Sequence, residues 1–344
     1  MLIQSRQSTS LVLHILIPDL FTHHSSVTPG LRFKALEKLL SLAEIKEWEQ
    51  PEFRSSLFFL FGLPTQSPLP VAPITRLYDV GDSSDKIWLR ADPVHLRVNL
   101  DHVILFDAAS AFTISREETE LFIEELNKLY SEDGLQFSAP SPTRWYVCLP
   151  EMPKLITSPL SEVIGRDIHD YMPDGEDKRR WRQILNEIQM LLHQSPVNAN
   201  REARGELPIN SVWFWGLGQL PESPPARWTQ VWSDDLLTQG LARLANTPQT
   251  GVPPTGVDWL THLTQGEHLL TLLISPKEPM DWSAWLKHLE TVWFEPLFKA
   301  LKQRQVSAVV LYPGDKRVFL ITDTHTHHWW RWRRNWQHFI PTDT

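Results

Sequence analysis

The chain has 344 residues, of which 42% are hydrophobic and 22% are charged, and its formal net charge is −8. This composition is typical of a globular protein that forms one large domain or two ordinary ones. The negative charge argues against nucleic acid as a partner. The single cysteine, Cys148, excludes an internal disulfide framework and a thiolate metal cluster, and it favours a cytoplasmic location.

The N-terminal segment predicts a buried strand followed by a helix. The apolar run Leu11–Ile17 is short and rich in branched residues, which favours a strand, and it is too short to span a bilayer. Pro18 and Asp19 follow it without a small-residue cleavage site, so we expect no signal peptide. Residues 31–48 show helical spacing of apolar side chains. A further apolar stretch, 55–64, leads into a Pro-rich loop.

Strands and helices alternate along the rest of the chain. Further strands are expected at 87–90, 103–107, 145–149, 212–215, 268–274, 307–312 and 318–324. Helices are expected at 115–130, 176–193, 234–246 and 281–303, and the main loops at 64–73, 140–142, 195–208 and 247–256. Ser115 and Glu118 form a capping-box pattern at the start of the first of these helices. The alternation predicts an α/β fold with a mostly parallel sheet flanked by helices on both faces.

The most distinctive segment is HQSPVNANREARGELPINSVWFWGLG, residues 193–218. It contains Asn198, Arg201 and Asn210 and ends in an apolar strand with the turn Gly216-Leu-Gly218. Glycines at such a turn let the backbone approach another group closely. Asn and Arg side chains are suited to holding either a loop or an oxyanion. From the residues alone, packing is the simpler interpretation of the turn.

The spacing H-x-x-P-V-N-x-x-R-x-x-x-G-x-x-P-x-N, followed by an apolar strand and G-x-G, resembles cofactor-independent phosphoglycerate mutases of the archaeal type. Those enzymes belong to the alkaline-phosphatase-like superfamily. The Trp-Phe-Trp-Gly version at 213–216 most resembles a bacterial group of "regulatory proteins" of the Rpf type. The resemblance implies a discontinuous core, residues 1–84 and 205–344, interrupted by an inserted α/β cap domain, residues 85–204. The core sheet would contain the strands at 11–17, 212–215, 268–274 and 307–312.

The catalytic residues that the resemblance implies are only partly present. Enzymes of the superfamily hold two divalent metals with Asp and His side chains and phosphorylate a Ser or Thr. Asp19 matches the first metal ligand, although Leu20 replaces the glycine that normally follows it. The glycine-rich loop that carries the nucleophile is missing, and only Ser55 and Ser56 lie near its place.

The remaining metal ligands are also depleted. The segment that should supply them, 272–282, contains Glu278 and Asp281 but no histidine. A remnant metal site would consist of Asp19, Asp323, His325 and His327, with His14, His23 or His24 as further candidates. The resemblance places Asp19 and Asp323 close together, at the carboxyl ends of the core strands. We expect no cofactor, with Mn²⁺ or Zn²⁺ as the alternative if this site is intact.

Three other segments carry polar or aromatic signals. Arg90, Arg97, Asn198, Arg201 and Asn210 are candidates for binding the anionic group of a small phosphorylated ligand. Asp92-Pro93 predicts a turn. Residues 165–175, GRDIHDYMPDG, resemble an Asp-x-His loop of the mutases' cap. The segment 329–336, WWRWRRNW, predicts packing first, a protein partner second and nucleic acid last.

Three functions remain open at this stage. The leading hypothesis is a catalytically degenerate phosphoglycerate-mutase-like protein with a regulatory or ligand-sensing role, because the 193–218 segment is retained while the catalytic set is depleted. The second is a metal-dependent phosphotransferase or phosphatase with rearranged ligands. The third is a protein-interaction module that uses the Trp/Arg-rich surface.

Overall fold

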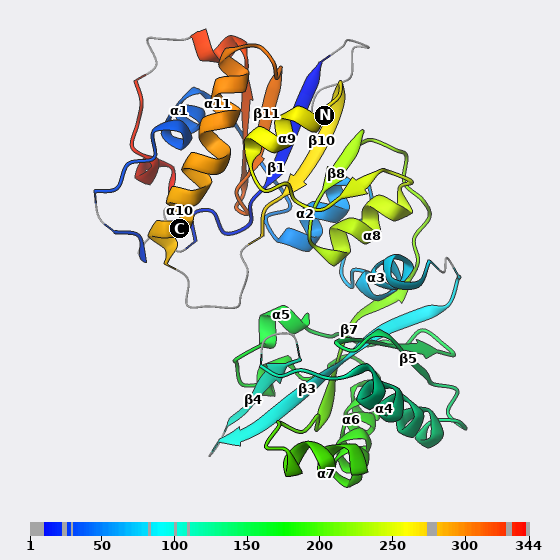
Figure 1. Ribbon diagram of the computed structural model, residues 1–344. Coiled ribbons are helices and arrows are strands. Elements are labelled where there is room, and N and C mark those ends of the chain that lie inside the picture. The colour runs from blue at the N-terminus through cyan, green and yellow to red at the C-terminus, as the bar shows by residue number, and fades with distance from the viewer. Residues whose placement is uncertain are drawn as a thin grey trace. The chain divides into compact units, whose positions relative to one another are not determined.

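The computed structural model describes residues 10–22, 26–28, 30–81, 84–99, 102–108, 111–273, 281–327 and 332–341. The chain forms two compact units, the first made of residues 1–65 with 223–344 and the second of residues 66–222 (Figure 1). The division differs from the expected core and cap at both boundaries. Residues 66–84 and 205–222, which the sequence assigned to the core, lie in the second unit.

The first unit is built on a seven-stranded sheet in the order β2-β12-β11-β1-β10-β8-β9. Strand β1 lies at its centre and pairs in parallel with β10 and β11, so the predicted strands at 11–17, 268–274 and 307–312 share one sheet. Only β12 and β2 join in antiparallel pairing. The strands are β1 (Leu11–Leu16), β2 (Glu44–Glu47), β8 (Gln230–Trp232), β9 (Gln249–Thr250), β10 (Gly266–Thr271), β11 (Ala308–Tyr312) and β12 (Arg317–Thr322).

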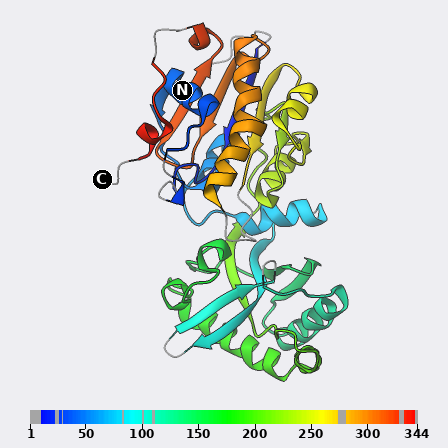
Figure 2. The ribbon, with the colours of Figure 1, turned by 60° about the vertical axis from the view of Figure 1, so that its left-hand side comes forward.

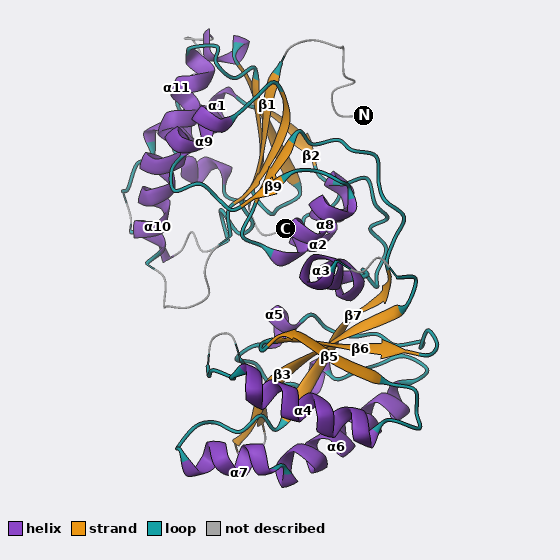
Figure 3. Ribbon diagram, turned by 45° about the vertical axis from the view of Figure 1, so that its right-hand side comes forward, coloured by secondary structure: helices purple, strands orange, loops and turns teal. Residues whose placement is uncertain are grey.

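Helices cover both faces of this sheet (Figure 3). One face buries Leu13 and Ile15 of β1 against α1, α10 and α11, and Figure 2 shows α11 lying along the strands. The other face carries α2 and α8. The helices are α1 (Lys34–Leu42), α2 (Phe53–Leu60), α8 (Leu236–Leu244), α9 (Gly256–His262), α10 (Trp282–Leu289), the π-helical η3 (Glu290–Phe294), α11 (Glu295–Lys302), η4 (Thr324–His327) and η5 (Trp336–Phe339).

The helix predicted at 31–48 is shorter than expected. It ends at Leu42, and residues 44–47 form the edge strand β2 instead. Ala43 is already extended, with ψ of 146°. The sequence EIKE of β2 contains one apolar residue, Ile45, so its pattern does not distinguish a strand from the end of a helix.

The second unit contains an antiparallel sheet with the order β4-β3-β6-β5, in which β7 pairs with the other edge of β3. The strand at 212–215 was therefore assigned to the wrong sheet, since it belongs to β7 and pairs with β3 in this unit. The structure thus corrects the expected core sheet. The strands are β3 (Ile87–Asn99), β4 (His102–Asp107), β5 (Gln136–Ser141), β6 (Arg144–Leu149) and β7 (Ser211–Gln219).

Helices α4 and α6 bury the apolar side of this sheet, and α3 and α5 lie on the other side (Figure 3). The predicted capping box is confirmed, because Ser115 and Glu118 exchange both hydrogen bonds at the start of α4. The loop expected at 195–208 instead begins with helix α7. The helices are α3 (Val71–Val80), α4 (Arg116–Leu129), α5 (Leu160–Val163), η2 (His169–Tyr171), α6 (Lys178–Gln194) and α7 (Pro196–Ala203).

The turn predicted at Asp92-Pro93 is absent, because β3 continues through both residues. On one edge, β3 pairs with β6 as far as Arg90 and with β4 from Val94 onward. Pro93 thus lies in the gap between two partner strands, where a missing N–H is tolerated. Within the described part of the chain, no helix is both long enough and apolar enough to cross a membrane.

Candidate functional site

An aspartate follows each of four parallel strands in the first unit. Asp19 follows β1, Asp235 follows β8, Asp281 precedes α10 on the connection from β10, and Asp315 follows β11. Ligands of open α/β sheets bind at the carboxyl ends of such strands. The carboxyl ends of these strands are therefore where a phosphoryl-transfer centre would be expected.

Two of these carboxylates stabilise turns. The side chain of Asp19 accepts a hydrogen bond from the Thr22 hydroxyl at 3.0 Å, and its backbone has a φ of 62°. This turn packs closely against the residues that follow β11. The approach requires a glycine at position 314, because a Cβ there would lie 2.8 Å from the Asp19 nitrogen. Asp315 forms an ion pair with Arg317, two residues further along the chain.

The other two carboxylates cap helices. Asp235 accepts hydrogen bonds from the backbone N–H and the hydroxyl of Thr238, at 2.7 and 2.8 Å, at the start of α8. Burial raises the pKa of Asp235, against the effect of these hydrogen bonds. Asp281 accepts from the backbone N–H groups of Ser283 and Ala284, at 2.9 and 3.2 Å, at the start of α10. Such caps satisfy donors that a helix cannot satisfy itself.

The predicted approach of Asp19 and Asp323 is wrong. The directions of the strands separate the two residues, because β12 runs antiparallel to β11. The Asp323 backbone N–H donates to Ser307, just before β11, whereas Leu20 donates to Pro313, just after β11. The two aspartates therefore lie at opposite ends of the strands: Asp19 lies near the carboxyl end of β11, and Asp323 lies near its amino end. Their joint metal site is not formed.

The histidines of the proposed remnant lie with Asp323 and not with Asp19. His325 accepts a hydrogen bond from the Thr322 backbone at 3.3 Å, and His327 ends the short helix η4. Within the described ranges, no group of three or more His, Cys, Asp or Glu side chains is placed to hold a metal ion. The candidates His23, His24 and Glu278 lie outside the described residues.

The two candidate nucleophiles have local structural partners. Ser55 lies in the first turn of α2, where its N–H and hydroxyl both donate to the Glu52 carboxylate that caps the helix. Ser56 is buried, donates to the Gln50 carbonyl and accepts from the Trp48 indole at 2.9 Å. The Ser55 hydroxyl and the Glu52 carboxylate thus belong to a helix cap, and the Ser56 hydroxyl is buried in a structural contact, so neither serine has the exposed setting of a nucleophile.

A buried histidine of β1 carries an unusual set of partners. The Nδ1 atom of His14 lies 2.9 Å from the Tyr312 hydroxyl, and its Nε2 lies 3.3 Å from Glu267. Arg227 pairs with the same carboxylate at 3.1 Å. Burial lowers the pKa of His14, and the contact with His14 holds the pKa of Glu267 at about 2. His14 is 3% exposed, so a ligand cannot reach it without displacing the core.

In the second unit, the two asparagines of the 193–218 segment brace the backbone. The buried amide of Asn198 donates to the carbonyls of Leu192 and Ile209, both at 2.7 Å, and accepts from the Ile209 N–H at 2.8 Å. Asn210 makes a matching pair of bonds to the N–H and carbonyl of Leu96 in β3, at 2.7 and 2.8 Å. These side chains hold protein groups, so their hydrogen-bonding capacity is used.

The arginine of the segment is also committed to protein groups. Arg201 is 1% exposed and donates to the carbonyls of Leu207 and Thr113, both at 2.9 Å. It also forms ion pairs with Glu118 at 2.8 Å and with Glu206 at 3.5 Å. The sequence indicated Glu118 only as a helix cap, because nothing in its spacing reveals a partner 83 residues away.

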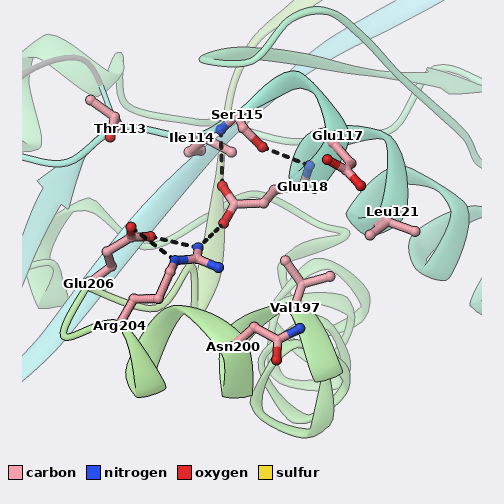
Figure 4. A pocket seen from close by; sticks show the side chains of 10 residues that line it. All are labelled: Thr113, Ile114, Ser115, Glu117, Glu118, Leu121, Val197, Asn200, Arg204 and Glu206. Atoms are coloured by element: carbon pink, nitrogen blue, oxygen red, sulfur yellow. Dashed lines mark hydrogen bonds and ion pairs between the residues drawn. The ribbon is translucent and has the colours of Figure 1, made fainter.

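A cavity of about 490 Å³ lies beside this ion pair (Figure 4). Arg204 reaches from the end of α7 toward Glu118 at 2.5 Å and Glu206 at 2.8 Å. Partial burial opposes ionisation of Glu118, yet hydrogen bonds from Ser115 and the two arginines lower its pKa overall. Three carboxylates and one guanidinium line the cavity, so it does not favour a phosphate. The lining residues are Thr113, Ile114, Ser115, Glu117, Glu118, Leu121, Val197, Asn200, Arg204 and Glu206.

The two arginines of β3 do not join these groups. Arg90 is buried and donates to Asp92 at 2.6 and 3.0 Å, with its guanidinium also over the ring of Trp215. Arg97 is exposed and lies over the ring of Phe106, 4.8 Å from its centroid. The five predicted anion-binding residues are therefore spread over separate structural contacts and do not converge on one ligand.

The predicted turn at Gly216-Leu-Gly218 is absent, because β7 continues through these residues to Gln219 with an irregular register, but the two glycines have the close-packing role that they suggested. A Cβ on Gly218 would lie 2.4 Å from the Cβ of Pro70, and one on Gly216 would lie 3.0 Å from the Cβ of Val71. Gly216 also has a φ of 70°, which L side chains rarely adopt. Because these two glycines lack a Cβ, β7 can approach the start of α3 closely.

The C-terminal segment is partly packed. Trp336 is 1% exposed, and its indole donates to the Leu31 carbonyl at 3.3 Å. Arg333 pairs with the buried Glu37 at 3.3 Å, whereas Trp332 is 91% exposed. Trp329, Trp330 and Arg331 lie outside the described residues, as does His328. An interaction role for this segment stays a prediction.

Sequence comparison provides the relatives of this chain. The 2,3-bisphosphoglycerate-independent phosphoglycerate mutase of Methanosarcina mazei is 30% identical over 141 residues, covering 40% of this chain and 35% of that enzyme. The corresponding enzyme of Methanosarcina barkeri is 30% identical over 146 residues, covering 41% and 36%. The chain is related to the phosphoglycerate mutases. The matches span about a third of the length of these curated relatives, and no protein-family model matches the chain.

Comparison with solved structures concerns the fold alone. The PH0037 protein from Pyrococcus horikoshii superposes with a TM-score of 0.52 and 13% identity, covering 91% of this chain and 88% of that one. The cofactor-independent phosphoglycerate mutase from Thermoplasma acidophilum gives a TM-score of 0.49 and 14% identity, covering 91% and 90%. The predicted fold class, an α/β fold with a mostly parallel sheet flanked by helices and a second α/β unit, is confirmed.

Proposed function

We propose that this phosphoglycerate-mutase-like chain does not interconvert phosphoglycerates and acts by binding, in a regulatory or ligand-sensing role. The observation that carries the proposal is the use of the aspartates at the carboxyl ends of the strands. Asp235 and Asp281 cap helices, and Asp19 and Asp315 stabilise turns. A two-metal centre needs carboxylate oxygens that are free to coordinate the ions.

Recruiting these carboxylates to a metal has a structural cost. Removing a helix cap destabilises a protein by about 0.5–2 kcal/mol, and two caps would be lost together. Asp323 offers no replacement as a ligand, because it lies at the other end of the strands, beside the start of β11. The described donors therefore do not fit the two-metal centre that the mutase resemblance implies, and we derive no metal-dependent step from them.

The proposal has a direct test on the full-length chain. We expect no turnover of 3-phosphoglycerate or p-nitrophenyl phosphate above a protein-free blank, with Mn²⁺ or Zn²⁺ supplied. The mutase resemblance also predicts saturable binding of 3-phosphoglycerate as a small phosphorylated ligand, measured by calorimetry, through side chains other than the five that the sequence singled out. Turnover that is lost in Asp19→Asn and kept in Asp133→Asn, an exposed control, would establish the phosphotransferase alternative instead. Absence of both binding and turnover would contradict the ligand-sensing role.

Two further parts of the proposal follow the mutase resemblance. We infer that the inserted cap, expected at residues 85–204, corresponds to the second unit, residues 66–222. The single cysteine supports a cytoplasmic location, which cell fractionation tests.

A further inference from the structure

A carboxylate in the second unit lies between two imidazole rings. The Asp167 carboxylate is 2.8 Å from the Nδ1 atom of His102 and 2.7 Å from the Nδ1 atom of His169. It also accepts from the Val103 backbone N–H at 3.2 Å. Because an ionised carboxylate only accepts hydrogen bonds, each Nδ1 must carry a proton. In the neutral ring, the Nε2 atom of His169 is then a hydrogen-bond acceptor.

His169 lies at the rim of a cavity of about 380 Å³ at one end of the sheet. Its walls are apolar side chains from β3, β4 and the segment around η2, and side-chain amides from α6 and the start of β7. The lining residues are Leu96, Val98, Val103, Ile168, His169, Met172, Asn186, Gln189 and Asn210. None of them is Asp, Glu, Lys or Arg, so the cavity does not favour a charged group.

The amides differ in how far protein groups occupy them. Asn210 is bound to the backbone of Leu96 on both sides of its amide. Gln189 makes one long contact, 3.4 Å, from its Nε2 to the Ser211 hydroxyl. Within the described part of the chain, no hydrogen bond is made by the Asn186 amide, by the Gln189 carbonyl or by the His169 Nε2. The cavity thus combines apolar side chains with three side chains that have donors or acceptors available, namely Asn186, Gln189 and His169.

We propose that this cavity binds a small, uncharged heteroaromatic molecule with the edge chemistry of a nucleobase. Its faces would pack on Ile168 and Met172, whose thioether adapts to flat surfaces. Asn186 would bind an edge that offers both a donor and an acceptor, as amides do with adenine. His169 would accept an N–H or O–H at its Nε2. The volume is at the lower end for ligand pockets, so a nucleoside fits better than a larger molecule.

This site does not depend on the absence of mutase turnover, since it lies in the second unit, whereas the strand ends considered for phosphoryl transfer belong to the first unit. The donors and acceptors proposed for the ligand are present both in free nucleosides and in the unpaired bases of RNA. The absence of Lys and Arg from the lining favours the free molecule, because RNA binding draws on phosphate contacts.

The experiment uses the full chain with adenosine, guanosine, cytidine and uridine as probes, measured by saturation-transfer NMR and calorimetry. We expect saturable binding of at least one nucleoside. Met172→Arg should abolish it by filling the cavity with a charge, and Asn186→Ala should weaken it about tenfold, which corresponds to the loss of a good hydrogen bond. His169→Gln should weaken it similarly while leaving the melting temperature unchanged, because His169 is exposed.

The control is His262→Gln, an exposed histidine of the first unit, which should bind the nucleoside as the parent does. Binding that persists unchanged in Met172→Arg would overturn the proposal, and so would failure of all four nucleosides to bind. A mixed-sequence RNA decamer that binds when the nucleosides do not would overturn it in favour of an RNA site.

Discussion

Replacing Asn198 by alanine tests whether this side chain braces the fold or is available to a ligand. The amide makes three hydrogen bonds in a buried environment, two to Ile209 and one to Leu192. The Leu192 carbonyl keeps a second partner, the Ser195 N–H at 3.2 Å. The substitution therefore strips the N–H and the carbonyl of Ile209, and each buried group without a partner costs about 1–3 kcal/mol. We expect the free energy of unfolding of the second unit to fall by about 2–4 kcal/mol.

The assay is equilibrium urea unfolding followed by tryptophan fluorescence, with hydrogen exchange to locate the loss. The exchange should increase most at the junction of α6, α7 and β7, which Asn198 joins. Asn200→Ala is the matched control, because Asn200 lies in the same helix, is exposed and should change stability by less than about 0.5 kcal/mol. Equal stability of the two variants would refute the bracing role and make Asn198 available as a ligand-binding residue.

Three further predictions concern buried groups. Arg201→Ala should destabilise the second unit by about 2–4 kcal/mol, because the carbonyls of Leu207 and Thr113 lose this buried donor and Glu118 loses one of its two arginine partners, whereas Arg97→Ala should have little effect in the same urea titration. Gly218→Ala should cost about 1–3 kcal/mol, since the added Cβ overlaps Pro70, and a wild-type melting curve would contradict the close packing. His14 has a lowered pKa, so the unfolded chain binds its proton more readily and the first unit should lose stability as pH falls below 6.5. His14→Gln should flatten that pH dependence in thermal melts, and an unchanged slope would assign it to other groups.

The elements of the fold were largely predictable, but the partners of one strand were not. Apolar runs at 11–17, 268–274 and 307–312 indicated central strands, and their branched side chains left little alternative. The strand at 212–215 has the same character, because β7 is also buried. Periodicity shows that a strand is buried and does not show which sheet buries it. Its assignment came from the family resemblance, and the structure corrected it.

The candidate site was less predictable for a related reason. Asp19 and Asp323 each follow a strand, and their sequence context is similar. Which edge of the sheet each reaches depends on the direction of its strand, and β12 returns antiparallel through a short turn after β11. A short connection of this kind favours antiparallel pairing, so the signal was present in the spacing of the last two strands. The partners of Arg201 and Asp167, by contrast, come from distant segments that no local pattern identifies.

The position of β1 at the centre of its sheet has a consequence for biosynthesis. Its neighbours β10 and β11 begin at residues 266 and 308, so a long stretch of chain must be synthesised after β1 before β1 can pair. Residues 66–222 form a compact unit that is finished much earlier. The nascent chain therefore carries an apolar, unpaired N-terminal segment while its middle part folds. Such exposed strands are prone to aggregation and are the surfaces that chaperones bind, which makes the late closure of the sheet the vulnerable step in producing this protein.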